Sequence, residues 1–93
     1  MVLDIVSKTI GSGDITGSIL SVTFGNYEKV ADAVASIRTG HSGDVLKVDN
    51  VTISGNVVDV HILRRTVVSG TSYTTTSGNQ ISGAVVTVIA DCI

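Results

Sequence analysis

The sequence has 93 residues, enough for one small domain, and its composition excludes several classes of protein. Its single cysteine, Cys92, excludes a disulfide framework within the chain. A net charge of −2 gives no general attraction to nucleic acid or to anionic lipid. Only 15% of the residues are charged, against roughly 25% in a typical soluble domain. A chain this small, with so few charges and no disulfide framework, is typical of proteins that are stabilised by self-association.

The predicted elements are almost all β-strands. Val, Ile, Thr and Ser dominate the sequence, and glycines divide it into runs of strand length. In chain order we expect strands at residues 2–10, 18–24, 33–39, 45–53, 57–63 and 84–93. Alternation predicts that the inward-facing residues include Leu20, Val22, Phe24, Ala33, Ala35, Ile37, Val58, Val60 and Ile62. The polar residues Ser21, Thr23, Asp59 and His61 are expected on the opposite faces.

The connections between these strands are read from their turn-forming residues. Ser54-Gly55-Asn56 predicts a hairpin, because Gly and Asn tolerate the positive φ of tight hairpin turns. Residues 26–32 are expected to form a polar connection with room for one helical turn, and residues 40–44 a loop. The stretch 69–79 is rich in Ser, Thr and Gly, which is typical of a mobile loop.

The last predicted strand is apolar on both faces, at Val85, Val86, Val88 and Ile89. Such a strand lies in the centre of a sheet or against another subunit. The sequence therefore predicts an all-β protein, a small antiparallel β-sandwich of about six strands. We expect a single domain over residues 1–93, made of an N-terminal strand and loop (1–17) and a core (18–93).

Candidate catalytic and metal-binding residues do not form a recognisable set. His41 lies near Asp44, and His61 near Asp59, but neither pair has the ligand number and spacing of a zinc site. No Gly-x-Ser-x-Gly motif occurs, and Cys92 lies at the extreme C-terminus. We therefore expect no enzyme activity, no metal and no cofactor.

Two short motifs are candidates for ligand binding. Residues 11–14 (Gly-Ser-Gly-Asp) resemble half of a phosphate loop, but no helix pattern follows, so we expect a turn unless Asp14 binds a polar ligand. Arg64 and Arg65 are adjacent on a predicted strand and must face opposite ways. One of them is expected to pair with a carboxylate or to cover apolar surface, and the other could meet an anionic or sugar ligand.

The order of these features resembles the H-type lectins and related small domains of bacteriophage tail and receptor-binding proteins. The resemblance covers about residues 11–91 and is one of order and spacing. The corresponding stretches are 21–24, 30–37, 42–48, 50–55, 57–63 and 84–90. The sequence departs from the family in having no proline and in placing Val88 where the closing strand usually carries Trp.

The resemblance implies a sugar site and an assembly. Gly13 and Asp14 approximate the family's Gly-x-Asp turn, and Lys47 matches its basic residue on the strand after the central loop. Arg64 and Arg65 stand where the family has an aromatic residue and a histidine. The implied assembly is a homotrimer, or a hexamer built from two trimers.

Two functions are expected on this basis. The first is a phage- or bacterium-encoded receptor-binding or tail module that binds a cell-surface glycan. The alternative is a chaperone or assembly accessory for another tail protein. Neither involves nucleic acid, since the net charge is −2. Neither involves membrane insertion, since no apolar run approaches the roughly 20 residues of a membrane span. Asp4 interrupts the short apolar N-terminus, so we expect no signal peptide but synthesis in the host cytoplasm, with the virion tail as the candidate destination.

Overall fold

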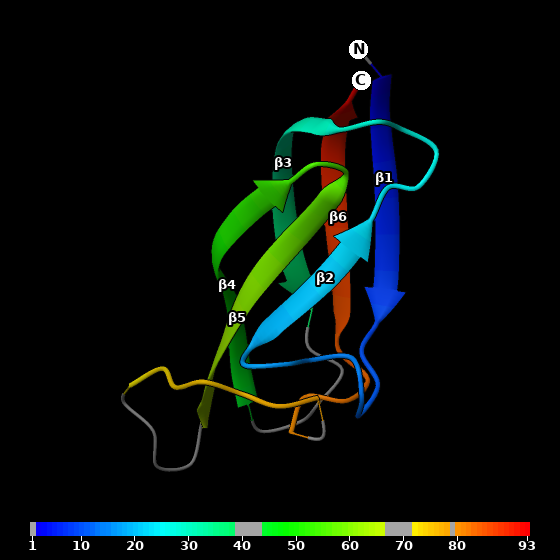
Figure 1. The fold of residues 1–93 in the computed structure, drawn as a ribbon. Coiled ribbons are helices and arrows are strands. Elements are labelled where there is room, and N and C mark those ends of the chain that lie inside the picture. Colours follow the sequence, from blue (N-terminus) through cyan, green and yellow to red (C-terminus); the bar gives the residue numbers. More distant parts are fainter. Residues whose placement is uncertain (1, 39–43, 67–71, 79) are drawn as a thin grey trace.

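The computed structural model describes residues 2–38, 44–66, 72–78 and 80–93, and none of these residues lies in a helix. They form an antiparallel β-sandwich of two three-stranded sheets (Figure 1). The strands are β1 (Val2–Thr9), β2 (Ile19–Thr23), β3 (Val30–Arg38), β4 (Asp44–Ser54), β5 (Val57–Thr66) and β6 (Val85–Cys92). The predicted fold class is confirmed. The described part of the chain contains no helix that is long and apolar enough to cross a membrane.

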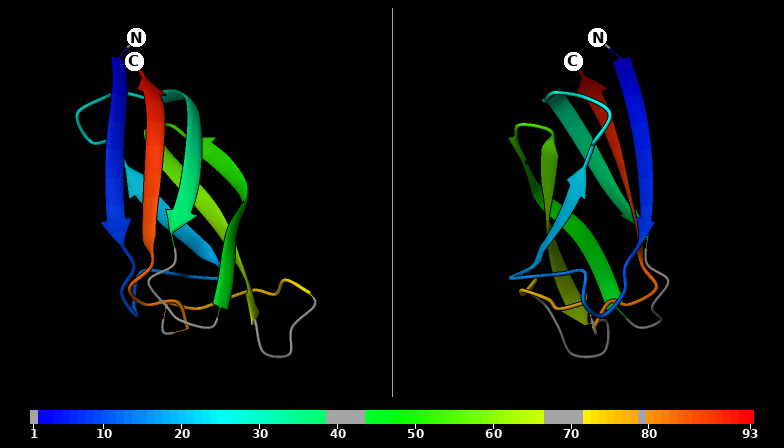
Figure 2. Two further views of the ribbon diagram at one scale, coloured as in Figure 1. Left: turned by 180° about the vertical axis from the view of Figure 1, so that it is seen from behind. Right: turned by 45° about the vertical axis from the view of Figure 1, so that its right-hand side comes forward.

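Sheet A has the strand order β1-β6-β3, and sheet B has the order β2-β5-β4. Figure 1 looks onto the outer face of sheet B, and the left view of Figure 2 looks onto the outer face of sheet A. The two chain termini lie together at one end of the sandwich. The segment that joins β1 to β2 and the described residues 72–78 and 80–84 before β6 lie at the opposite end, which is called the loop end below.

The core lies between the two sheets and follows the alternation of the sequence. Leu20 and Val22 of β2 lie on the inner face of sheet B together with Val58, Val60 and Ile62 of the neighbouring strand β5. All five side chains are buried. The predicted inward positions of β3 pack against this cluster from the other sheet. Because side chains alternate along a strand, the polar residues between them are left on the outer faces.

Strand β6 lies in the centre of sheet A, which was one of the two positions predicted from its apolar character. Its inward side chains Val86, Val88, Ala90 and Cys92 are all 0% exposed. The outward Ile89 remains 39% exposed. The central position of β6 therefore accounts for its buried inward face, but not for the apolar Ile89 on its outward face.

The connection predicted over residues 26–32 differs from the structure. Strand β3 begins at Val30, three residues earlier than expected, and no helical turn precedes it. Val30 is buried, and its backbone N–H donates to the carbonyl of Gly55 in the β4–β5 hairpin at 2.8 Å. A bulge between Val30 and Asp32 then restores the alternation of the strand. The start of the strand was not predicted from the sequence, because the bulge interrupts the alternation of inward and outward residues there.

Candidate ligand-binding site

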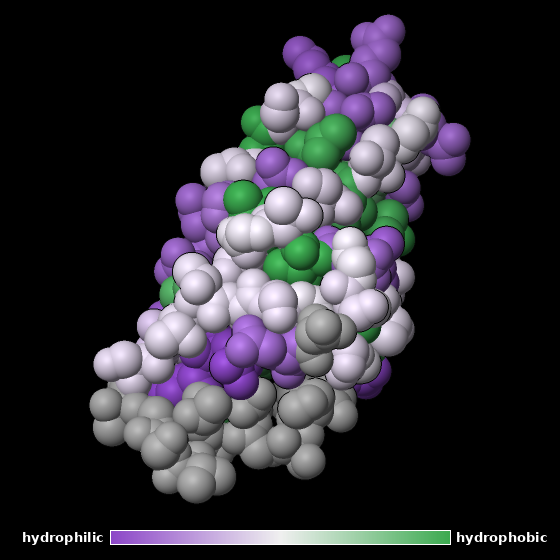
Figure 3. All heavy atoms as spheres, turned by 60° about the horizontal axis from the view of Figure 1, so that its bottom comes forward, coloured by the Kyte–Doolittle hydropathy of each residue, from purple (hydrophilic) through white to green (hydrophobic). Residues whose placement is uncertain are grey.

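The outward side chains of β2, β5 and β4, called the sheet B face below, are mainly polar. Ser21 Oγ donates to Asp59 Oδ1 at 2.6 Å, and Thr52 Oγ1 lies 3.4 Å from His61 Nε2. Figure 3 views the molecule from the loop end and shows hydrophilic residues near that end and at the opposite end, with isolated hydrophobic residues between them. A face with hydroxyl, carboxylate and imidazole groups side by side can form hydrogen bonds with a polar ligand.

A basic–aromatic cluster, made of Lys47, Arg65 and Tyr73, lies at the end of this face. Nζ of Lys47 on β4 is 4.2 Å from the centroid of the Tyr73 ring, and Cζ of Arg65 on β5 is 5.5 Å from it. Both distances are within the range of cation–π contacts, which contribute about 0.5–1 kcal/mol each at exposed sites. The cluster combines an aromatic ring with two cations on neighbouring strands.

Tyr73 is held in place by backbone pairing of its neighbour. Thr74 and Arg64 exchange two backbone hydrogen bonds, of 3.0 Å from the Arg64 N–H and 2.8 Å from the Thr74 N–H. This bridge adds residue 74 to the exposed end of β5. The ring next to it is therefore fixed relative to Arg65, which follows Arg64 on the strand.

The cations of the cluster keep unused hydrogen-bonding capacity. No carboxylate of the described residues lies within ion-pair distance of Lys47 or Arg65. Nε of Arg65 is buried and has no hydrogen-bond partner among the described residues. A buried donor without a partner costs free energy, roughly 1–3 kcal/mol for a group that has lost its hydrogen bond.

The two predicted arginines face opposite ways, as their adjacency required. Arg65 shares the outward side of β5 with His61 and contacts Tyr73. Arg64 shares the inward parity of Val60 and Ile62, and is half-buried at the loop end of the sandwich. Of the two, only Arg65 belongs to the cluster.

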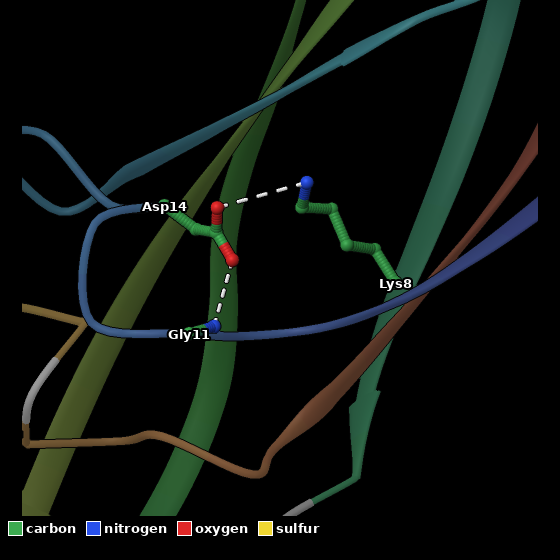
Figure 4. Close-up of polar contacts among 3 residues, drawn as sticks. All are labelled: Lys8, Gly11 and Asp14. Carbon is green, nitrogen blue, oxygen red and sulfur yellow. Dashed lines mark hydrogen bonds and ion pairs between the residues drawn. The ribbon is translucent and has the colours of Figure 1, made fainter.

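Gly13 and Asp14 form the predicted turn, and the Asp14 carboxylate interacts with residues of the same segment. The backbone N–H of Gly11 donates to Asp14 Oδ2 at 2.7 Å, and Nζ of Lys8 lies 3.7 Å from Asp14 Oδ1 (Figure 4). Both carboxylate oxygens thus have partners inside the segment 8–14. The structure pairs Asp14 with Lys8 and not with Lys47, so the predicted site residues do not all come together.

The loop between β1 and β2, residues 10–18, contacts the segment that carries Tyr73 at two points. Ser18 Oγ accepts a hydrogen bond from the Thr76 backbone N–H at 2.7 Å. The backbone of Gly78 packs so closely against the turn that an added Cβ would lie 2.5 Å from the Gly11 carbonyl oxygen. These contacts help to position residues 72–78, which include Tyr73.

Tyr73 is the site residue that sequence reasoning missed. It lies in the stretch 69–79, which was predicted to be a mobile loop and of which residues 69–71 and 79 are outside the described residues. The available signal was rarity, because the chain has only 3% aromatic residues and Tyr73 is the one in a Ser/Thr-rich segment. Its contact with Lys47 and Arg65 depends on pairing between segments that are distant in the sequence.

The described residues contain no group of three His, Cys, Asp or Glu side chains that could hold a metal ion. His41 and the side chain of Asp44 lie outside the described part of the chain. Cys92 is fully buried, and its burial, followed by the carboxylates of Asp4 and Asp91, raises the pKa of the thiol. A thiol with a raised pKa is a poor nucleophile at neutral pH.

Comparison of the chain with protein families, with curated proteins and with solved structures gives no match. The resemblance to H-type lectins therefore stays a prediction.

Proposed function

We propose that this protein is a self-assembling β-sandwich that binds a cell-surface glycan through the sheet B face, as a phage tail or receptor-binding module. The observation that carries the proposal is the placement of Tyr73 against Lys47 and Arg65. An aromatic ring offers a sugar an apolar surface, and the two cations offer hydrogen bonds to its hydroxyl or carboxylate groups. The sequence shows no aromatic residue at the strand end, and Tyr73 supplies one from the following loop.

The rest of the face extends the contact surface for such a ligand. His61 and Asp59 lie further along β5, and their partners Thr52 and Ser21 lie on the neighbouring strands. Sugar rings carry hydroxyl groups that both donate and accept hydrogen bonds. A row of hydroxyl, carboxylate and imidazole groups beyond an aromatic ring matches that requirement.

The proposal is tested on a glycan array with the purified wild-type chain. We expect binding that weakens at least tenfold in Lys47→Gln and in Tyr73→Leu. Lys29→Gln is the matched control, because it removes the same charge from an exposed site in the connection before β3. A wild-type protein that binds no glycan on the array, or a Lys47→Gln variant that binds as well as wild type, contradicts the proposed site.

A second candidate function is favoured by the opposite face of the sandwich. Leu3, Ile5 and Val34 are exposed to 73%, 61% and 62% on the outside of sheet A, where a second protein surface could bind. This supports the chaperone or assembly accessory for another tail protein. A blank glycan array together with a complex of defined stoichiometry with the product of an adjacent gene would favour this alternative.

A further inference from the structure

The outward side chains of β1, β6 and β3, called the sheet A face below, carry an apolar row. The strand register places Ile5 and Val34 on either side of Ile89. These side chains are exposed to 61%, 62% and 39%, and Leu3, next to the row, to 73%. Together with Asp32 and Ala33, three of these residues line a shallow hollow in the face. Four large aliphatic groups thus meet solvent together on one face of the sandwich.

The rows on either side of the apolar row differ in chemistry. Towards the chain termini, the register aligns Leu3, Asp91 and Asp32, so that this row carries two carboxylates. Towards the loop end, it aligns Ser7, Thr87 and Ser36, which carry hydroxyl groups. The Ser7 and Thr87 hydroxyls lie 3.0 Å apart and share one hydrogen bond. The face therefore has an acidic row, an apolar row and a hydroxyl row in succession.

We propose that a second copy of this chain covers the sheet A face, across a twofold axis that runs perpendicular to the strands along the Ile89 row. In this dimer the apolar row of one copy packs on that of the other. The acidic row of each copy lies opposite the hydroxyl row of its partner, with Asp91 opposite Thr87 and Asp32 opposite Ser36. The inference identifies the surface of the self-assembly in the proposed function and rests on that proposal.

The order of the rows selects this orientation. A carboxylate only accepts hydrogen bonds, and a pair of hydroxyls that share one bond still has a proton to donate. A twofold axis along β6 would instead place Asp91 opposite its own copy, where like charges oppose association. Arg38, one row beyond Ser36 and so about 7 Å further along β3, adds a positive charge near Asp32 of the second copy.

The dimer has two consequences that can be measured. Its two sheet B faces point away from each other, because each copy uses its opposite face for the contact, so the assembly presents two binding sites. Three strands spaced about 4.8 Å apart make a narrow contact. It is smaller than the roughly 800 Å² per partner of a standard interface. We therefore expect dissociation on dilution.

The first test measures molecular mass by sedimentation equilibrium between about 5 and 500 µM, a range chosen around the micromolar affinity expected of a small interface. The wild-type chain is expected to pass from monomer to an even-numbered assembly as its concentration rises, and Ile89→Glu to lose that association. Val57→Glu is the control, because Val57 is a partly exposed aliphatic residue on the outward side of β5, in the other sheet. A wild-type chain that is monomeric or only trimeric at every concentration, or an Ile89→Glu variant that still associates, overturns the proposal.

The second test checks the orientation by cross-linking in a Cys92→Ala background. Facing sheets lie about 10 Å apart. A disulfide cannot span that gap, but a short bis-maleimide can. The proposed axis predicts cross-linked dimers when Thr87→Cys and Asp91→Cys variants are mixed, and little product from Asp91→Cys alone. The reverse pattern, with Asp91→Cys joining itself, contradicts the proposed axis.

Glycan binding by the same samples separates this inference from the proposed function. Loss of association in Ile89→Glu with weaker, monovalent glycan binding supports both. Association that survives in Ile89→Glu, with normal glycan binding, overturns only the interface. A wild-type dimer that depends on Ile89 but binds no glycan supports the interface and contradicts the proposed function.

Discussion

The ammonium group of Lys47 lies 4.2 Å from the centre of the Tyr73 ring, although one residue belongs to β4 and the other to the segment after β5. Arg65 approaches the same ring from the neighbouring strand. This contact converts two isolated basic residues into one cluster with an aromatic surface. It also makes the position of Tyr73 depend on the loop that carries it.

We expect Tyr73→Phe and Tyr73→Leu to separate the role of the ring from that of the hydroxyl. The cation–π contacts need the ring, so Tyr73→Phe should keep glycan binding within about threefold, and Tyr73→Leu should lose at least tenfold. The cost to folding should be below about 1 kcal/mol in each case, because the contacts are partly exposed. Urea unfolding measures the stability and a titration with an array-selected glycan measures the affinity. Equal binding by Tyr73→Leu and wild type would contradict a role for the ring.

We expect Gly78→Ala to move the Tyr73 segment. The added Cβ would lie 2.5 Å from the Gly11 carbonyl oxygen, so the backbone of one loop must shift. Overpacking of this kind costs about 1–3 kcal/mol, and glycan binding should fall with it. Gly13→Ala is the control, because nothing lies within 4 Å of its added Cβ. Similar stability for Gly78→Ala and Gly13→Ala would show that the close approach has no structural role.

We expect Asp14 to contribute to the turn and not directly to ligand binding. Asp14→Ala removes the acceptor for the Gly11 N–H and should lower the free energy of unfolding by about 1 kcal/mol. Asp14→Asn keeps that acceptor and loses only the ion pair with Lys8, whose partners are 42% and 33% exposed, so it should cost less than about 0.5 kcal/mol. Both are measured by urea unfolding. A tenfold loss of glycan binding in Asp14→Asn, with stability unchanged, would instead place Asp14 in the site, as the lectin resemblance implies.

We expect the stability of the fold to decrease at alkaline pH through Cys92. Burial, with the nearby Asp4 and Asp91, raises the pKa of this thiol in the folded chain. The unfolded chain therefore releases the thiol proton at lower pH than the folded chain does. The contribution of Cys92 is complete below the ordinary thiol pKa of about 8.5 and is lost as pH rises through the raised folded value. Urea unfolding from pH 7 to 10 should show this decrease in wild type and a smaller one in Cys92→Ala; parallel pH profiles would contradict it.

Most of the fold was predictable because its signals are local. Alternation along 18–24 and 57–63 placed Leu20 and Val60 inside and Asp59 outside, and the structure confirms these faces. The start of β3 was predicted incorrectly, because the bulge after Val30 interrupts the alternation that prediction depends on.

The candidate site was only partly predictable. The sequence indicated Lys47 and Arg65 separately, and the required alternation at Arg64 and Arg65 was correct. It did not indicate Tyr73, because the ring reaches the cations through a bridge between Thr74 and Arg64 that no local pattern encodes.

The sequence by itself determined the strand content, the inward residues and the character of the closing strand, since each depends on side-chain alternation over a few neighbours. Only the tertiary structure decided which side chains share a face. Sheet A pairs β1, β6 and β3, which are far apart along the chain, and so aligns Ile5, Ile89 and Val34 in one exposed row. The loop packing likewise brings Tyr73 to Lys47 and Arg65. Pairing between distant segments is selected by burial of the whole core, and for that reason both candidate surfaces emerged only from the folded chain.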